Sequence, residues 1–265
     1  MQEVLVSRID LHTKTLEHKK DLVAEEAPFH VFLNQTHYVT ILCTPSQLKE
    51  LAVGYLLSEG LLKSIDEIRE VRLETGDKCV VRLKPYLDVE RQIAMAQPFA
   101  RVIISACGSA DYWPISKLMD RLNLPETARG FKMEANLLLA SVRQLNKFAE
   151  GFRKTGGVHV AALYSREGRP IAIAEDVGRH NAVDKVIGEC ALKSVNFTEC
   201  FVALSGRLTG DIVLKAARMQ IPIVVSVAAA INSGIEVAKR TGITLVGFAR
   251  GKRMNAYTHI ERITF

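Results

Sequence analysis

The second half of the chain alternates between short apolar runs and stretches with helical spacing, and this alternation restricts the possible folds more than any other feature. Helical patterns fill most of the intervals between the apolar runs. We predict strands at Val158 to Leu163, Ile171 to Ala174, Phe201 to Leu204, Ile223 to Val227 and Thr244 to Phe248. Such alternation predicts an α/β fold with a largely parallel sheet and helices on its faces.

The N-terminal third predicts a smaller α+β unit. Its helix is expected to begin at a capping box, Thr44 to Gln47, and to end near Gly60. Paired strands are expected over 29–34 with 38–42 and over 68–73 with 79–83. We predict an N-terminal α+β domain over 1–105, a connecting segment over 106–134 and a C-terminal domain over 135–265.

The composition, 48% hydrophobic and 24% charged residues, is that of an ordinary soluble protein. No apolar run reaches transmembrane length and no leader pattern is present, so a cytoplasmic protein without membrane contact is expected. The five cysteines are scattered and never form C-x-x-C. We therefore expect neither structural zinc nor a disulfide framework.

A formal net charge of +6 favours an anionic ligand or partner. Nucleic acid is not expected, because the basic residues are dispersed, aromatic residues make up only 6%, and no nucleic-acid-binding motif is present. A phosphate-bearing small molecule or an acidic protein surface fits better. The predicted helix over Ala135 to Ala149 has one apolar side, which allows a homodimer.

The stretch Glu175 to Lys185 places many polar residues at a predicted strand-to-helix junction, where α/β proteins usually bind or react. One interpretation is a capped helix start, with Asn181 as N-cap and Asp184 in the capping-box position. This interpretation does not explain the charged residues that precede Asn181. His180, crowded by opposite charges, suits ligand orientation or proton movement.

Cationic residues follow two of the predicted strands. Ser205-Gly206-Arg207 comes after one, and Arg250, Lys252 and Arg253 come after the last. Because parallel strands end at the same edge of a sheet, these arginines predict a phosphate clamp. A solvated basic turn is the alternative interpretation.

Five blocks in this order resemble motifs of the FdhD/NarQ family, sulfurtransferase accessory proteins for formate dehydrogenase. The blocks are L-A-V-G-Y-L with S-E-G at 51–60, T-G-G-V-H at 155–159, E-D-V-G-R-H-N-A-V-D-K at 175–185, S-G-R at 205–207 and G-F-A-R at 247–250. The resemblance implies a three-layer α/β/α C-terminal domain similar to the cytidine-deaminase fold. Deaminase activity is not expected, since that chemistry needs H-x-E followed by P-C-x-x-C, whereas His159 is followed by Val160-Ala161 and no C-x-x-C exists.

The resemblance also implies a bound substrate, molybdenum bis(molybdopterin guanine dinucleotide), which GDP or GTP would mimic. No zinc is expected, because thiolate and imidazole ligands are not clustered in the sequence. By this likeness the cofactor-binding loop is Phe248, Ala249, Arg250, Gly251, Lys252 and Arg253. Ser205, Gly206, Arg207 and His180 join the predicted cofactor-binding residues because of their positions at a strand end and at the strand-to-helix junction.

Cys107 is the candidate reactive thiol, because it follows a predicted strand and precedes Gly108, whereas the other cysteines lie within apolar elements. Family members commonly have C-G-x-C here, and the first cysteine carries a persulfide. This chain has Ala110 at the second position, so a two-thiol relay within the motif is excluded. A single thiolate still suffices to accept and pass on sulfur.

The resulting hypothesis is a sulfurtransferase. Cys107 would accept sulfur from a cysteine desulfurase and transfer it to the molybdenum cofactor for formate dehydrogenase. The alternative is a non-enzymatic chaperone that delivers the cofactor without sulfur chemistry. Loss of function on replacing Cys107 would distinguish the two.

Overall fold

A computed structural model describes residues 1–74, 76–87, 124, 126–127 and 130–265. Cys107 and most of the predicted connecting segment lie outside these residues. The N-terminal elements are β1 (Gln2–Asp10), β2 (Thr15–Val23), β3 (Ala27–Leu33), β4 (Thr36–Cys43), α1 (Leu48–Ser58), β5 (Ile68–Leu73) and β6 (Lys78–Leu83). The remaining elements are β7 (Met133–Glu134), α4 (Ala135–Phe148), α5 (Glu150–Thr155), β8 (His159–Ser165), β9 (Pro170–Asp176), α6 (Arg179–Leu192), β10 (Cys200–Leu204), α7 (Gly210–Arg218), β11 (Ile223–Ser226), α8 (Asn232–Thr241), β12 (Thr244–Arg250), β13 (Arg253–Ala256) and β14 (Ile263–Thr264).

A six-stranded sheet in the order β13-β12-β11-β10-β8-β9 forms the centre of the C-terminal half. β10, β11 and β12 are parallel, as predicted, but β8 is antiparallel to both of its neighbours and β13 is antiparallel to β12. The tight turn from Ser165 to Arg169, with Gly168 at φ 73°, joins β8 to β9 and forces antiparallel pairing. The sheet is therefore mixed rather than largely parallel.

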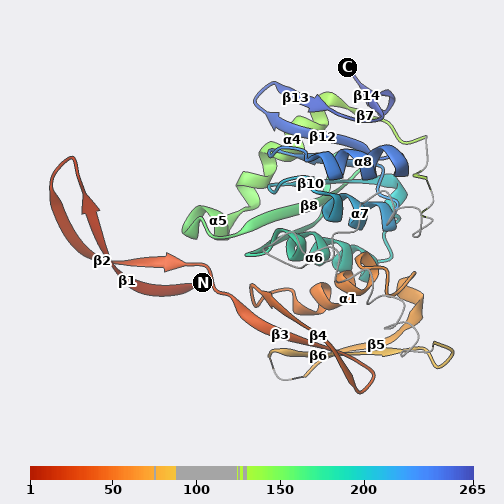
Figure 1. The fold of residues 1–265 in the computed structure, drawn as a ribbon, viewed down its shortest axis with the longest axis horizontal. Helices are drawn as coiled ribbons and strands as arrows, with labels where there is room; N and C mark the ends of the chain where they lie inside the picture. The colour runs from red at the N-terminus through yellow and green to blue at the C-terminus, as the bar shows by residue number, and fades with distance from the viewer. Residues whose placement is uncertain (75, 88–123, 125, 128–129) are drawn as a thin grey trace.

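Helices cover both faces of this sheet (Figure 1). α4 lies on one face, where Leu138, Val142 and Leu145 belong to the same buried cluster as Tyr164 and Phe201 of the sheet. The rings of these two aromatic residues stack with centroids 5.2 Å apart. The apolar side of α4 is thus covered within the chain and offers no dimer surface. The homodimer itself stays a prediction.

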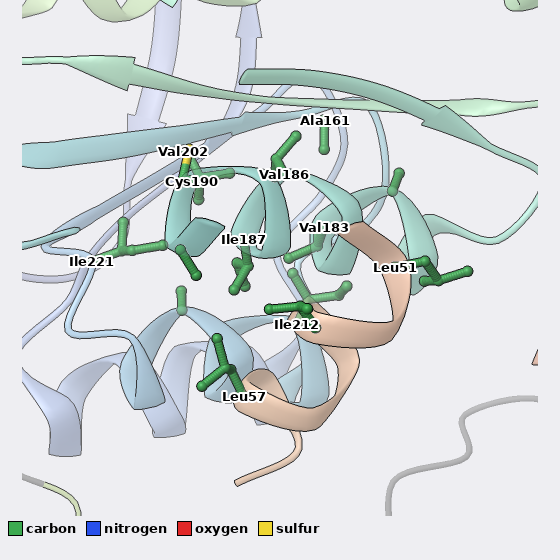
Figure 2. Packing of buried hydrophobic residues seen from close by; sticks show 14 of the residues in the cluster. Leu51, Leu57, Ala161, Val183, Val186, Ile187, Cys190, Val202, Ile212 and Ile221 are labelled. Atoms are coloured by element: carbon green, nitrogen blue, oxygen red, sulfur yellow. The ribbon is translucent and has the colours of Figure 1, made fainter. Parts of the chain in front are cut away.

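The opposite face of the six-stranded sheet carries α6, α7 and α8. α1 packs on α6 from outside and in turn covers the four-stranded sheet, whose order is β4-β3-β6-β5 (Figure 1). Figure 2 shows Leu51 and Leu57 of α1 pointing into the same core as Val183 and Ile187 of α6. One continuous apolar core therefore joins the two sheets.

The crossing of α1 and α6 is unusually close because a glycine lies on each helix. A Cβ atom built on Gly54 would lie 1.7 Å from the carbonyl oxygen of Asp184, and one on Gly188 would lie 1.8 Å from that of Glu50. No side chain fits at either position. The two backbones can touch only because both residues lack a Cβ atom.

A buried charge network lies at the C-terminal end of α1, between α6 and α7. Lys215 Nζ is 2.9 Å from Asp184 Oδ1 and 2.5 Å from Glu59 Oε1, and Ser58 Oγ donates to Asp184 Oδ1 at 2.5 Å. Arg218 donates to the carbonyl oxygen of Ser58 at 2.6 Å. Two cations thus face two carboxylates, which compensates for their removal from water.

Two regions differ from the sequence-based expectations. The first 23 residues contain β1 and β2, a hairpin that was not predicted and that extends away from the rest of the molecule (Figure 1). The expected loop over Phe248 to Arg253 is instead the tip of the β12–β13 hairpin, in which Arg250 pairs with Arg253. The added strand β13 extends the sheet beyond β12.

Candidate functional site

The predicted site residues gather at one edge of the six-stranded sheet. The carboxyl ends of β9, β10, β11 and β12 lie at this edge, together with the start of β8. His159 at the start of β8 pairs with Asp176 at the end of β9, and the amide of Ser205, just after β10, donates to the carbonyl oxygen of Val160 at 3.0 Å. This edge is where parallel α/β sheets usually bind ligands.

The turn between β9 and α6 is held by the fully buried carboxylate of Asp176. Its oxygens accept hydrogen bonds from the amide of Gly178 at 2.8 Å, from Asn181 Nδ2 at 2.9 Å and from the amide of Thr44 at 3.1 Å. Lys185 Nζ forms an ion pair with it at 2.7 Å, and neither side chain is exposed. These bonds fix the backbone that presents the first residues of α6.

The alternative interpretation of this stretch as a conventional capped helix start is wrong in its details. Gly178, not Asn181, occupies the N-cap position of α6, and no side chain caps the helix. Asp184 turns into the buried network instead of capping. Lys185 is buried and donates to the carbonyl oxygens of Thr44 and Glu175. Partners distant in sequence outweigh the local capping pattern here.

The predicted capping box at the start of α1 is also wrong. Gln47 occupies the N-cap position with φ 49° and makes no capping bond. Thr44 Oγ1 accepts from the amide of Val177 at 3.1 Å, and Gln47 Nε2 donates to the carbonyl oxygen of Ile173 at 3.1 Å. The segment before α1 therefore supports the β9–α6 turn.

His180, in the first turn of α6, faces Asp211 in the first turn of α7. His180 Nε2 lies 2.5 Å from Asp211 Oδ2, and Thr209 Oγ1 and the amide of Ile212 also bond to this carboxylate. Burial raises the pKa of Asp211, but the hydrogen bond and charge of His180, with the Thr209 bond, lower it to about 2. The ionised carboxylate can only accept a hydrogen bond, so His180 Nε2 donates to it.

His159 lies among cations at the same edge. Burial lowers its pKa, and the charges of Arg179, His180 and Arg207 lower it further. Ser205 Oγ lies 3.3 Å from His159 Nδ1 and accepts from the amide of Val160 at 3.0 Å. His159 is a strand residue that also belongs to this cluster, and the T-G-G-V-H block at 155–159 was the signal for it in the sequence.

Gly206 permits the close approach of Arg179 to the β10 loop. A Cβ atom at Gly206 would lie 3.1 Å from Cβ of Arg179 and 3.7 Å from His159 Nδ1. Ser226 Oγ lies 2.6 Å from the carbonyl oxygen of Gly206 and so joins the loop to β11. The arrangement concentrates positive charge beside neutral hydrogen-bond donors, which suits an anion such as phosphate.

Arg250 joins the end of β12 to this edge. Its Nε donates to the carbonyl oxygen of Val227 at 2.8 Å, and its guanidinium carbon lies 5.8 Å from the ring centroid of Phe248. Phe248 has φ 51° and is 41% exposed. An exposed aromatic face beside an arginine can stack on a planar base and contact its phosphates.

The four described cysteines are all buried and free. Burial is the largest cause that raises the pKa of each thiol, to about 11 for Cys43 and Cys200 and to about 12 for Cys79 and Cys190. These thiols are protonated near neutrality and hidden from a donor protein. The fifth, Cys107, lies outside the described residues.

Among the residues that the structure describes, no three His, Cys, Asp or Glu side chains form a group suited to a metal ion. The absence of zinc remains a prediction. No helix in the described ranges is long and apolar enough to span a membrane.

These features define a mixed α/β protein in which cationic and histidine side chains gather at one edge of the six-stranded sheet. The sequence profile of the FdhD/NarQ family matches residues 24–264, and the chain belongs to this family, which confirms the resemblance seen in its motifs. Its relatives include the sulfur carrier protein FdhD of Sulfolobus acidocaldarius, 37% identical over 92% of both chains. The protein of the same name from Bacillus licheniformis is 33% identical over 94% of this chain and 93% of its own.

A solved structure shows the same fold. The crystal structure of a proposed formate dehydrogenase accessory protein from Desulfotalea psychrophila is 27% identical, with a TM-score of 0.78 over 99% of both chains.

Proposed function

We propose that this chain is a sulfurtransferase that carries sulfane sulfur on Cys107 from a cysteine desulfurase to a molybdenum–guanine dinucleotide cofactor, for use by formate dehydrogenase in the cytoplasm. The observation that carries the proposal is the burial of the other cysteines. Four of the five thiols are buried with raised pKa values, which leaves Cys107 as the candidate nucleophile. Relatives named as sulfur carriers match nearly the whole chain, Cys107 included within the matched length.

The first step of the proposed reaction is a thiol–persulfide exchange. The Cys107 thiolate attacks the terminal sulfur of the donor persulfide, a new S–S bond forms on Cys107, and the donor cysteine leaves as a thiolate. Delivery of this sulfur as sulfide takes two electrons. Because Ala110 replaces the second motif cysteine and the other thiols are buried, an external thiol reductant supplies them.

The sheet edge is the proposed binding site for the cofactor, which is the substrate. Arg207, Arg179 and His180 would hold phosphate oxygens, with Ser205 as a neutral donor. Phe248 and Arg250 at the β12–β13 hairpin would hold the guanine nucleotide end, together with Lys252 and Arg253 of the same hairpin. The domain division at 1–105 and 135–265, with a C-terminal domain of cytidine-deaminase type, belongs to the same proposal.

Peptide mapping after incubation with a desulfurase and cysteine tests the sulfur step. We expect one added sulfur, on Cys107. Cys107→Ser should give a folded protein that binds GDP but does not activate formate dehydrogenase, whereas Cys190→Ser, a matched change of a buried thiol, should keep the activity. Full activation by Cys107→Ser would favour the chaperone that delivers the cofactor without sulfur chemistry.

Calorimetry with GDP tests the binding edge independently. Arg250→Ala should weaken GDP binding by about ten- to a hundredfold, because charge-assisted bonds contribute about 1.5–3 kcal/mol and each 1.4 kcal/mol is about tenfold. Arg69→Ala, the same change on the distant strand β5, should leave binding unaltered. Equal binding by both variants would contradict the assignment of this edge.

A further inference from the structure

His159 is a half-buried histidine that is surrounded mainly by positive charge. It begins β8 at the sheet edge described above, and its Nδ1 lies 3.3 Å from Ser205 Oγ. The charged groups that act on its ring come from three segments, and they are Arg179 and His180 of α6, Arg207 after β10 and Asp176 at the end of β9. Of these four groups, Asp176 alone favours a proton on the ring.

The carboxylates at this edge are already paired with other cations. Lys185 Nζ lies 2.7 Å from the fully buried Asp176 carboxylate, and His180 Nε2 lies 2.5 Å from that of Asp211. Burial is the largest cause that lowers the pKa of His159, and the three neighbouring cations lower it further against the smaller effect of Asp176. In these surroundings the ring of His159 is mostly neutral near pH 7.

An anion bound at this edge would reverse that balance. His159 and Arg179 flank the same glycine, since a Cβ atom on Gly206 would lie 3.7 Å from His159 Nδ1 and 3.1 Å from Cβ of Arg179. A phosphate group that approaches Gly206 would therefore come close to both side chains. Its negative charge offsets the cations around His159 and favours the charged form of the ring.

We propose that His159 is a further ligand-binding residue of this edge and takes up a proton when a phosphate-bearing ligand binds. The inference rests on the binding edge proposed above. The proton passes from the solvent to a ring nitrogen, and no other covalent bond changes. In the imidazolium both nitrogens donate, so Nδ1 donates to Ser205 Oγ, which also accepts from the amide of Val160 at 3.0 Å. The hydroxyl hydrogen of Ser205 then remains to bond to the phosphate.

This coupling makes the affinity for the ligand depend on pH. A ligand that raises the pKa of His159 must, by thermodynamic reciprocity, bind more tightly when the ring is protonated. The protonated fraction grows as the pH falls, so this contribution to affinity should increase from about pH 8 to about pH 6. The coupling also selects for charge, because an uncharged nucleoside such as guanosine would cause no proton uptake.

Calorimetry with GDP in two buffers of different ionisation enthalpy measures the proton uptake. The wild type should take up more protons than His159→Gln at the same pH. Because the terminal phosphate of GDP itself titrates near about pH 6, the two proteins are compared with each other. The ratio of their affinities should grow about three- to tenfold from about pH 8 to about pH 6, since an opposite charge nearby raises the pKa of a histidine by about one unit or more. The matched control, His12→Gln in the exposed turn between β1 and β2, should behave as the wild type.

Nuclear magnetic resonance of the histidine rings follows the titration of His159 directly. Its midpoint should move to higher pH on addition of GDP, and also of sulfate at constant ionic strength, while that of His12 stays in place. Binding of GDP with an unaltered midpoint would overturn the inference and leave the binding edge intact. If GDP does not bind but sulfate moves the midpoint, the coupling stands and the nucleotide assignment of the edge fails. No movement with either anion overturns the coupling.

Discussion

Replacing Gly54 by alanine should strongly destabilise the protein, although alanine is the better helix former. The added Cβ would lie 1.7 Å from the carbonyl oxygen of Asp184, against an ordinary contact of at least 3.4 Å. The obstacle is the backbone of α6, which has no rotamer to change. α1 and α6 must therefore move apart by about 1.7 Å at this point.

The expected loss in the free energy of unfolding follows from the contacts that the separation of α1 and α6 breaks. Overpacking against a rigid neighbour costs about 1–3 kcal/mol. Separation of the helices also stretches the 2.5 Å bond from Ser58 to the Asp184 carboxylate, and a buried bond to a charged group contributes about 1.5–3 kcal/mol. The higher helix propensity of alanine returns about 1 kcal/mol. The free energy of unfolding should fall by about 2–5 kcal/mol, a large part of the total for a typical domain.

Urea unfolding followed by circular dichroism measures this change. Gly188→Ala should have a similar effect, and the double variant should cost less than the sum, because one separation of the helices accommodates both methyl groups. Gly76→Ala is the matched control, since a Cβ atom there would meet nothing within 4 Å. If Gly54→Ala stays within about 0.5 kcal/mol of the control, the close crossing described here is incorrect.

Three further changes test other parts of the structure. Lys215→Met should lower the free energy of unfolding by about 3–5 kcal/mol in urea, since it leaves the carboxylates of Asp184 and Glu59 facing each other in the core; a neutral result would contradict the network. Because the pKa of His159 lies below its usual 6.5 in the folded state, the unfolded chain binds the proton first, so stability should fall as the pH drops below about 6.5. His159→Gln should reduce that slope in urea midpoints, and an unaltered slope would show that other groups cause it. In the native protein near pH 8, a thiol reagent should react with one cysteine, and the other four should react only after unfolding. Fast reaction of a second thiol would contradict the burial of Cys43, Cys79, Cys190 and Cys200.

Much of the C-terminal half could be predicted from the sequence because its central strands, β8, β10 and β11, are buried on both faces. Continuous apolar runs mark such strands, and β8 to β12 begin and end within a few residues of the predicted positions. Once the strands were predicted, the polar residues that follow them could be located as well, and Ser205 and Arg250 lie at one edge of the sheet. Strand direction was less predictable, because the turn at Gly168 looks the same in sequence whether or not its strands pair.

The sequence-based predictions were wrong where a side chain bonds to a residue far away in the sequence instead of to a nearby helix end. Thr44 and Asp184 both stand in a spacing typical of a helix cap, yet Thr44 bonds to residues after β9 and Asp184 bonds to Lys215 of α7. A single sequence gives no sign that Gly54 and Gly188 face each other. The β1–β2 hairpin was missed because its strands are mostly exposed and rich in polar residues, so they lack the apolar runs that identified the others.

The α1–α6 crossing has a consequence for synthesis on the ribosome. Ser58 and its partner Asp184 are 126 residues apart, and Lys215 comes still later. At about 5–20 residues per second, α1 is made roughly 6–25 s before α6. During that interval its glycine face and Glu59 have no partner, and the side of α1 that packs on α6 is uncovered. The nascent N-terminal third must therefore remain soluble with an incomplete core until the C-terminal half emerges.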